Sequence, residues 1–330
     1  MKQQWTGFQS ILATHIERFI AYKRSLGRRY DIEEMTLRLL DRNLVGEEIQ
    51  QPSDITPELI ETILASRPRP RPRSYNHLLC TMRRLFDWLV TQEVLEHSPV
   101  QVQPKRRISQ RAPFIFDIHS AKRLLEVARR LPDRSTAPMR GITYHVIFAI
   151  LYGLGLRVGE VCRLKIEDVD FNRKLLIIQK TKFYKSRLVP FGPKLETLLF
   201  EYLQIKNKKV GTCSPDTPFF SFTKRGEIHP CTVSQTFHNL IPRLQFDVPL
   251  GCSSPRLHDL RHSFAVGTLT RWYRSGINPG VELLKLSTFL GHVDINSTAV
   301  YLTMTPALLQ EANRRFERLT APLITEEISR

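Results

Sequence analysis

The chain has 330 residues, 42% of them hydrophobic, and a formal net charge of +17. This length exceeds one typical domain and the hydrophobic content suffices for an ordinary core, so the composition excludes a disordered chain and favours two domains. Residues 1–10 lack the apolar core of a signal peptide and no stretch is long and uncharged enough to span a bilayer, so we expect a cytoplasmic protein.

The positive charge is unevenly distributed along the chain. Residues 1–110 carry 17 basic and 13 acidic side chains, whereas residues 111–330 carry 32 and 19. Lysines and arginines that displace counterions favour a polyanionic partner, with a merely solubilising basic surface and an anionic membrane surface as alternatives. No basic amphipathic anchor stands out, and five scattered cysteines without metal-ligand spacing predict reduced thiols and no metal site.

Apolar residues at helical spacing predict four helices in the first hundred residues. The predicted helices are 8–26, ended by Gly27; 31–44, capped by Asp31; one that Thr56 and Pro57 begin and that carries Leu59 to Leu64; and 74–94. Together they would form a small helical bundle.

An alternating arginine–proline run separates the third and fourth predicted helices. Proline at every second position forbids a helix and favours an extended segment with its arginines outward. We expect these arginines to contact phosphates, with a solvated loop as the alternative. They are Arg67, Arg69, Arg71 and Arg73.

Residues 99–113 have no hydrophobic period and are predicted to form an exposed basic linker that contains the domain boundary. The basic residues of this linker are Lys105, Arg106, Arg107 and Arg111. Lys105, Arg106 and Arg107 extend the predicted phosphate-contacting surface.

The rest of the chain mixes helices with a β-hairpin. Residues 175–178 are a predicted strand, and residues 187–190 are its hairpin partner. Helices are predicted from Ser120 to about residue 131, at 142–151, at 156–164 behind a glycine turn, at 195–205, at 233–240 before Pro242, at 258–273, at 281–290 and at 306–319.

The last third of the chain, together with Arg157 further upstream, holds groups that could cleave a phosphodiester. Such a reaction without a metal needs a nucleophile, cations over the non-bridging oxygens and a proton donor. Arg157 follows a glycine turn at a helix start, His258 and Arg261 share a helix face, and Tyr301 offers a phenol that can attack phosphorus. Taken singly, Arg157 could be a surface arginine, Tyr301 a half-buried aromatic ring, and the nearby His262 and His292 packed or capping histidines.

Taken together, these residues resemble the tyrosine recombinase (phage-integrase-like, Xer-like) family. The matching motifs are Gly155-Leu156-Arg157-Val158-Gly159-Glu160, His258-Asp259-Leu260-Arg261-His262-Ser263-Phe264-Ala265, Leu290-Gly291-His292 and Ala299-Val300-Tyr301. The resemblance implies a mainly α fold with a small antiparallel β-sheet, arranged as a two-domain DNA clamp. Residues 1–98 would be the helical core-binding (SAM-like) domain, 99–113 the basic linker and 114–330 the mixed α/β catalytic domain.

The resemblance also implies the role of each site residue. Tyr301 would attack the scissile phosphate and leave a 3′-phosphotyrosyl link and a free 5′-hydroxyl. Arg157 and Arg261 would hold the non-bridging oxygens. His258 and His292 would complete this pocket, with His258 accepting the tyrosine proton.

The proton donor to the leaving 5′ oxygen is expected in the predicted hairpin. Lys182 matches the lysine of the family, but Thr181 and Phe183 stand where the family usually has glycines. Lys180 and Lys185 therefore remain alternatives.

The function implied by the resemblance is site-specific recombination of double-stranded DNA at specific sites. The enzyme would need no cofactor and no metal, because the phosphotyrosine conserves the bond energy, and it would act near the nucleoid as a homotetramer or with related recombinases. We expect integration, excision or transposition of a mobile element, although chromosome-dimer resolution and phage integration use the same parts. The alternative functions are those of a catalytically silent DNA-binding protein and of a type IB-like topoisomerase. The terminal helix, at 306–319, would either dock on a neighbouring protomer or pack on its own domain.

Overall fold

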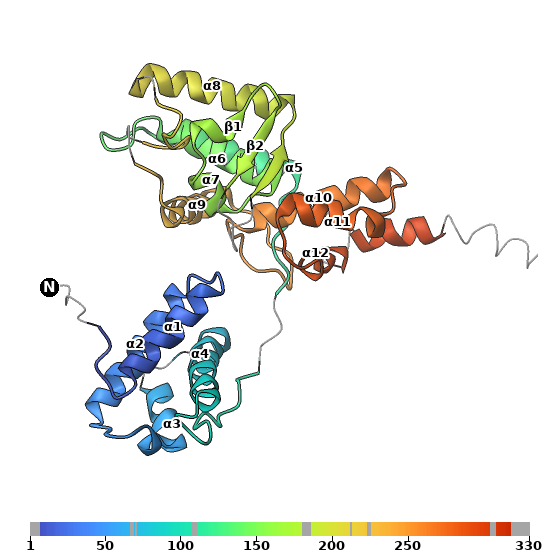
Figure 1. Ribbon diagram of the computed structural model, residues 1–330. Coiled ribbons are helices and arrows are strands. Elements are labelled where there is room, and N and C mark those ends of the chain that lie inside the picture. The colour runs from blue at the N-terminus through green and yellow to red at the C-terminus, as the bar shows by residue number, and fades with distance from the viewer. Residues whose placement is uncertain are drawn as a thin grey trace, which may run out of the picture. The chain divides into compact units, whose positions relative to one another are not determined.

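A computed structural model describes residues 7–66, 69, 71–106, 111–179, 186–211, 213–222, 226–303 and 308–317. Contacts within the chain divide it into two compact units, residues 1–110 and 111–330, and this division falls inside the predicted linker. The fold is mainly helical with one small antiparallel sheet, as the sequence predicts, and each unit has its own set of helices (Figure 1).

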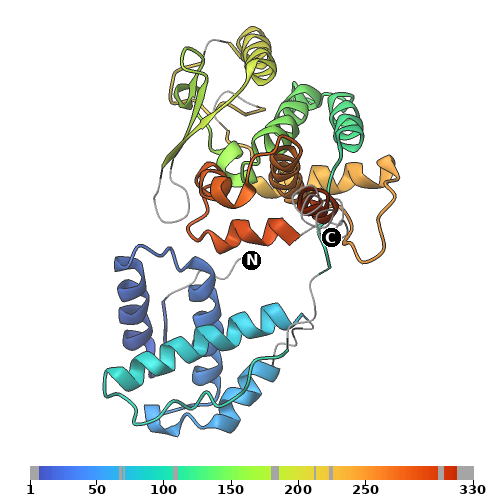
Figure 2. The same cartoon turned by 90° about the vertical axis from the view of Figure 1, so that its right-hand side faces the viewer.

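The first unit is a cluster of four helices around one hydrophobic core (Figure 2). The helices are α1 (Ala13–Ser25), α2 (Asp31–Gly46), α3 (Pro57–Ala65) and α4 (Pro72–Thr91), with a 3-10 turn at Pro52–Asp54. Helix α4 contacts the other three, and its buried stripe includes Leu78, Met82, Leu85 and Leu89. The predicted bundle is therefore organised around its last helix.

The start of the first unit differs from the prediction, because α1 begins at Ala13 and not at Phe8. The backbone N–H groups of Gln9 and Ser10 donate to the buried carboxylate of Asp41, at 3.0 and 2.8 Å. These bonds hold the residues before α1 against α2. They satisfy N–H groups that would have formed helical bonds in a longer α1.

One predicted helix cap of the first unit is confirmed, and another is wrong. The Thr56 hydroxyl accepts from the Leu59 N–H at 3.3 Å, as expected for an N-cap. Asp31, the predicted cap of α2, is instead its first helical residue. Tyr30 occupies the cap position with φ at +58°, and its buried ring packs edge-on against Phe19.

The arginine–proline run is not extended throughout. Pro72 and Arg73 are the first residues of α4, because proline is tolerated at the first helical position, where its missing N–H has no helical partner. Arg71 precedes them with an extended backbone. Arg67 lies outside the described residues.

The first part of the predicted linker packs on the first unit. Val100 is buried in its core, and the Arg83 guanidinium donates to the Val102 carbonyl. The Asn76 side chain makes two hydrogen bonds of 2.8 Å with the Lys105 backbone. These contacts fix residues 100–105 against α4.

The second unit surrounds a nearly fully buried helix, α6. Its elements are α5 (Ile118–Arg129), α6 (Arg140–Leu154), α7 (Val158–Cys162), β1 (Val169–Asp170), β2 (Leu175–Ile178), β3 (Arg187–Pro190), α8 (Pro193–Val210), α9 (Pro230–Leu244), α10 (Asp259–Arg274), α11 (Pro279–Leu290) and α12 (Asn296–Ala299), with 3-10 turns at Ile166–Asp168 and Val300–Thr303. Residues 308–317 are also helical. Helix α6 packs against α5, α8 and α10.

The sheet has the order β1-β2-β3, with Leu176 opposite Val169 on one side and Val189 on the other. The β2–β3 hairpin matches the prediction, while the two-residue strand β1 was too short to show a period. Helix α9 continues through Pro242, where the sequence predicted its end. Pro242 lacks the N–H that would bond back along the helix, but the helix continues because Leu244 beyond it is buried in the core.

None of the described helices combines the length and the hydrophobicity needed to cross a membrane. Within the same ranges, no group of three or more His, Cys, Asp or Glu side chains is placed to hold a metal ion.

We predict that Asp41→Ala destabilises the first unit by about 2 kcal/mol, because buried N–H groups lose a charged acceptor. Urea unfolding followed by Trp88 fluorescence, with Trp5 and Trp272 replaced by Phe, measures this. Asp31→Ala is the control, since Asp31 is exposed and lies 3.7 Å from Arg24; it should cost less than about 0.5 kcal/mol. Equal effects of the two substitutions would contradict the assigned role of Asp41.

Candidate active site

The candidate site is built around the buried guanidinium of Arg261, on α10. This side chain is only 1% exposed and donates to the Gly155 carbonyl at 2.7 Å and to the Leu290 carbonyl at 2.8 Å. Gly155 ends α6 and Leu290 ends α11, so one arginine joins two helix C-termini to α10. Burial lowers the pKa of Arg261 to about 10, with a further contribution from Arg157, and the group stays protonated at neutral pH.

Gly155 is required at this junction for two reasons. Its φ of +61° is strained for other residues, and a Cβ atom there would come within 2.6 Å of the Phe264 ring. The chain can therefore turn from α6 towards α7 only with glycine at this position.

Arg157 lies at the N-cap of α7 and reaches the same region. Its guanidinium donates to Glu160 Oε1 and to the Gly291 carbonyl, both at 2.9 Å. The side chain is still 34% exposed, unlike that of Arg261. Arg157 thus offers an oriented but accessible cation next to a buried one.

A buried ion pair between Glu160 and Arg187 supports both arginines. Arg187, on β3, donates to both carboxylate oxygens of Glu160, at 3.0 and 2.9 Å, and its Nε donates to the Phe289 carbonyl. Burial would raise the pKa of Glu160, but the hydrogen bonds and charge of Arg187, with those of Arg157, lower it to about 2. No role for this pair was predicted from the sequence.

Tyr301 lies in the 3-10 turn after α12 and is 2% exposed. Its hydroxyl is 3.0 Å from His262 Nδ1, and its ring stacks on that of His292 with centroids 6.3 Å apart. Burial raises the pKa of the Tyr301 hydroxyl, although the nearby positive charges of Arg261 and Arg157 act in the opposite direction.

Three histidines, His258, His262 and His292, lie near Tyr301 and the two arginines. The ring of His258, at the N-cap of α10, packs edge-on against His262 with centroids 4.8 Å apart, and His292 Nδ1 is 2.7 Å from the Thr298 hydroxyl. Loss of surrounding water lowers the pKa of each ring to about 4, and neighbouring cationic groups add to this effect. His258 nevertheless remains exposed at the surface. All three rings are therefore neutral at pH 7.

The structure brings five of the six predicted catalytic residues into one cluster. Arg157, His258, Arg261, His292 and Tyr301 come from α7, α10, the end of α11 and the turn after α12. Lys182 and its alternatives Lys180 and Lys185 lie outside the described residues. The Tyr301 hydroxyl is contacted by His262, which was predicted from the sequence to be a packing or capping group.

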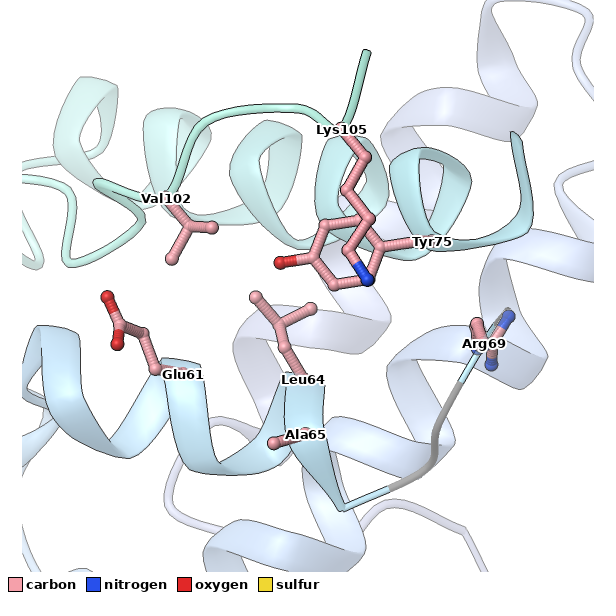
Figure 3. A pocket seen from close by; sticks show the side chains of 7 residues that line it. All are labelled: Glu61, Leu64, Ala65, Arg69, Tyr75, Val102 and Lys105. Carbon is pink, nitrogen blue, oxygen red and sulfur yellow. The ribbon is translucent and has the colours of Figure 1, made fainter. Parts of the chain in front are cut away.

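In the first unit, two predicted DNA-binding residues share a pocket of about 730 Å³ (Figure 3). Lys105 Nζ lies 4.2 Å from the Tyr75 ring centroid, and Arg69 also lines the pocket, whose apolar lining includes Leu64 and Val102. The predicted DNA-binding residues Arg71, Arg73 and Arg106 are exposed, and Arg107 lies outside the described residues.

We predict that the Glu160 ion pair makes the second unit sensitive to acid. Because its pKa lies near 2 and not at the ordinary 4.5, the pair contributes fully above about pH 4.5 and loses its contribution as the pH falls. Between pH 5 and pH 3 the wild type should lose about 2 kcal/mol more stability than Glu160→Gln, which cannot titrate.

Urea unfolding followed by Trp272 fluorescence, with Trp5 and Trp88 replaced by Phe, measures this difference. Glu167→Gln is the control, because Glu167 forms an exposed pair with Lys165, and its pH dependence should follow that of the wild type. Parallel curves for the wild type and Glu160→Gln would contradict the assignment.

Comparisons with known proteins place this site in a family. The profile of the Phage integrase family matches residues 116–307. A Sinorhizobium fredii protein named as an integrase/recombinase is 31% identical over 312 residues, which cover 92% of this chain and 96% of that protein. The tyrosine recombinase XerD of Listeria monocytogenes is 26% identical over 299 residues, covering 90% and 91%.

Solved structures show the same fold. The Tn1549 transposon integrase in complex with transposon right-end DNA matches with a TM-score of 0.65 at 16% identity, covering 93% of this chain and 98% of the other. The family profile spans more than half of the sequence and includes every described residue of the cluster around Arg261. The chain therefore belongs to the phage integrase family, whose tyrosine recombinases are DNA strand-transferring enzymes.

Proposed function

We propose that this protein is a site-specific recombinase that cleaves and rejoins duplex DNA through a 3′-phosphotyrosyl intermediate. The observation that carries the proposal is the position of the Tyr301 hydroxyl within a cluster that contains two arginines, Arg157 and Arg261, and three neutral histidines. A protein that only binds DNA needs no nucleophile in such a cluster. The mobile-element context of the Tn1549 integrase supports a role in integration, excision or transposition.

Cleavage would proceed by in-line attack of the Tyr301 oxygen on the scissile phosphorus. As the bond from that oxygen to phosphorus forms, the bond to the 5′ oxygen breaks, and Arg157 and Arg261 stabilise the charge on the non-bridging oxygens. Lys182, or its alternatives Lys180 and Lys185, gives a proton to the leaving 5′ oxygen. Attack by another strand's 5′-hydroxyl reverses these steps, so strand exchange needs no nucleotide and no metal.

The charge distribution supports a double-stranded DNA partner. The second unit carries most of the net positive charge. In the first unit, Arg69 and Lys105 line one pocket, and Arg71, Arg73 and Arg106 are exposed. We propose that both units contact DNA, that residues 1–98 and 114–330 act as core-binding and catalytic domains, and that a homotetramer or a mixed assembly pairs two sites at the nucleoid.

Trapping of a covalent adduct tests Tyr301 as the nucleophile. A nicked suicide substrate, made from a site found by footprinting inverted repeats beside the gene, should trap a covalent protein–DNA adduct. Tyr301→Phe should abolish the adduct and keep site binding within a few-fold, because only the attacking oxygen is lost. A gel shift measures binding and a denaturing gel measures the adduct.

A wild type that binds the site and forms no adduct would refute the enzymatic proposal and favour a silent binding protein. Products recombined between two sites support a recombinase. Relaxation of any supercoiled plasmid without such products would favour a topoisomerase.

The hairpin lysine has its own test. Lys182→Ala should slow cleavage of the ordinary substrate by about 10²-fold or more, because a proton donor is removed. A substrate with a bridging 5′ sulfur should restore the rate, since a thiolate leaves without protonation. Lys180→Ala and Lys185→Ala are the matched controls, and rescue of one of these in place of Lys182→Ala would move the role to that residue.

A further inference from the structure

His262 touches the reacting atom of the proposed nucleophile. Its Nδ1 lies 3.0 Å from the Tyr301 hydroxyl oxygen, and the two rings are tilted with centroids 5.5 Å apart. His258, the acceptor expected from the sequence, packs its ring against His262, and no hydrogen bond joins it to Tyr301 in the described part of the chain. The geometry therefore favours a different histidine from the expected one.

The contact with Tyr301 is compatible with a neutral His262 ring. In the tautomer that carries its proton on Nε2, Nδ1 is unprotonated and accepts from the tyrosine hydroxyl. Burial, together with the charges of Arg256 and Arg261, lowers the pKa of His262 to about 4 and keeps the ring neutral at pH 7. The resting site thus holds an empty proton acceptor at the nucleophile.

The buried carboxylate of Asp259 lies near the His262 ring. His262 Nε2 is 4.0 Å from Asp259 Oδ1, which is too long for a hydrogen bond but close enough to favour a positive ring. Asp259 is fully buried, and its oxygens accept from the Arg256 guanidinium at 3.0 Å and from the Arg256 backbone at 2.8 Å. The nucleophile and the base are therefore in hydrogen-bond contact, and a fixed carboxylate lies near the base without a hydrogen bond to it.

A bound phosphodiester would make the transfer easier. Its negative charge would offset the repulsion that Arg157 and Arg261 exert on a protonated histidine, and any anion near an imidazole favours its charged form. The acceptor would then gain basicity only when the substrate is in place. This coupling explains how a ring that is neutral at rest can take a proton during cleavage.

We infer that His262 receives the Tyr301 proton during cleavage and returns it during rejoining. The inference rests on the proposed function. The proton passes from the Tyr301 oxygen to His262 Nδ1 as the tyrosyl oxygen–phosphorus bond forms, the 5′ oxygen–phosphorus bond breaks, and the hairpin lysine protonates the leaving oxygen. Rejoining moves the same proton back to Tyr301.

The test is single-turnover cleavage of the suicide substrate by His262→Ala in the presence of added imidazoles. Without them the variant should be slower than the wild type by about 10²-fold or more. Added imidazoles should restore cleavage, and among imidazoles of similar size the rate should rise with the pKa of the base. A group that only filled space would give a rescue independent of that pKa.

Two further variants control for folding and for the neighbouring ring. His262→Asn keeps a hydrogen-bond acceptor near the Nδ1 position but cannot hold the proton, so it should bind the site as the wild type does and cleave as slowly as His262→Ala. His258→Ala should lose rate without a rescue that depends on imidazole pKa.

Wild-type rates in His262→Asn, or the pKa-dependent rescue in His258→Ala alone, would overturn the inference. Failure of the wild type itself to form an adduct would instead overturn the proposed function, so the two failures are distinguishable.

Discussion

The site depends on the two hydrogen bonds that the buried Arg261 guanidinium gives to the ends of α6 and α11. The last carbonyls of a helix have no partner within it, and burying them unpaired costs free energy. Arg261 donates to one carbonyl at each of these helix ends. It thereby fixes the chain segment that leads to Arg157 on one side and the segment that leads to His292 on the other. The same side chain thus holds the site together and supplies its central cation.

The Glu160–Arg187 pair extends this arrangement to the sheet. Glu160 orients Arg157, while Arg187 leads from β3 to the Phe289 carbonyl near the end of α11. A Cβ atom at Gly291 would approach Arg187 to 2.7 Å, so glycine is also required for this contact. Arg157 is partly exposed and His258 is exposed, so under the proposed mechanism a phosphate meets these two residues first.

Much of this fold could be predicted from periodicity, glycine and proline, because these depend on local chemistry. The stop at Gly27 and the Thr56 cap belong to this class. The late start of α1 could not be predicted, because it depends on Asp41, far along the chain. For the site, motif order identified the residues that form the cluster, but only packing shows that His262 and not His258 meets Tyr301, and that Arg187 reaches Glu160.

The central claim is that Tyr301 becomes covalently linked to DNA through a 3′ phosphate. The most direct measurement is mass spectrometry of the trapped adduct after digestion with protease and nuclease. The account predicts a peptide containing Tyr301 that carries a nucleotide joined through its 3′ phosphate to the phenolic oxygen. A nucleotide on another residue, or one joined through a 5′ phosphate, would contradict it.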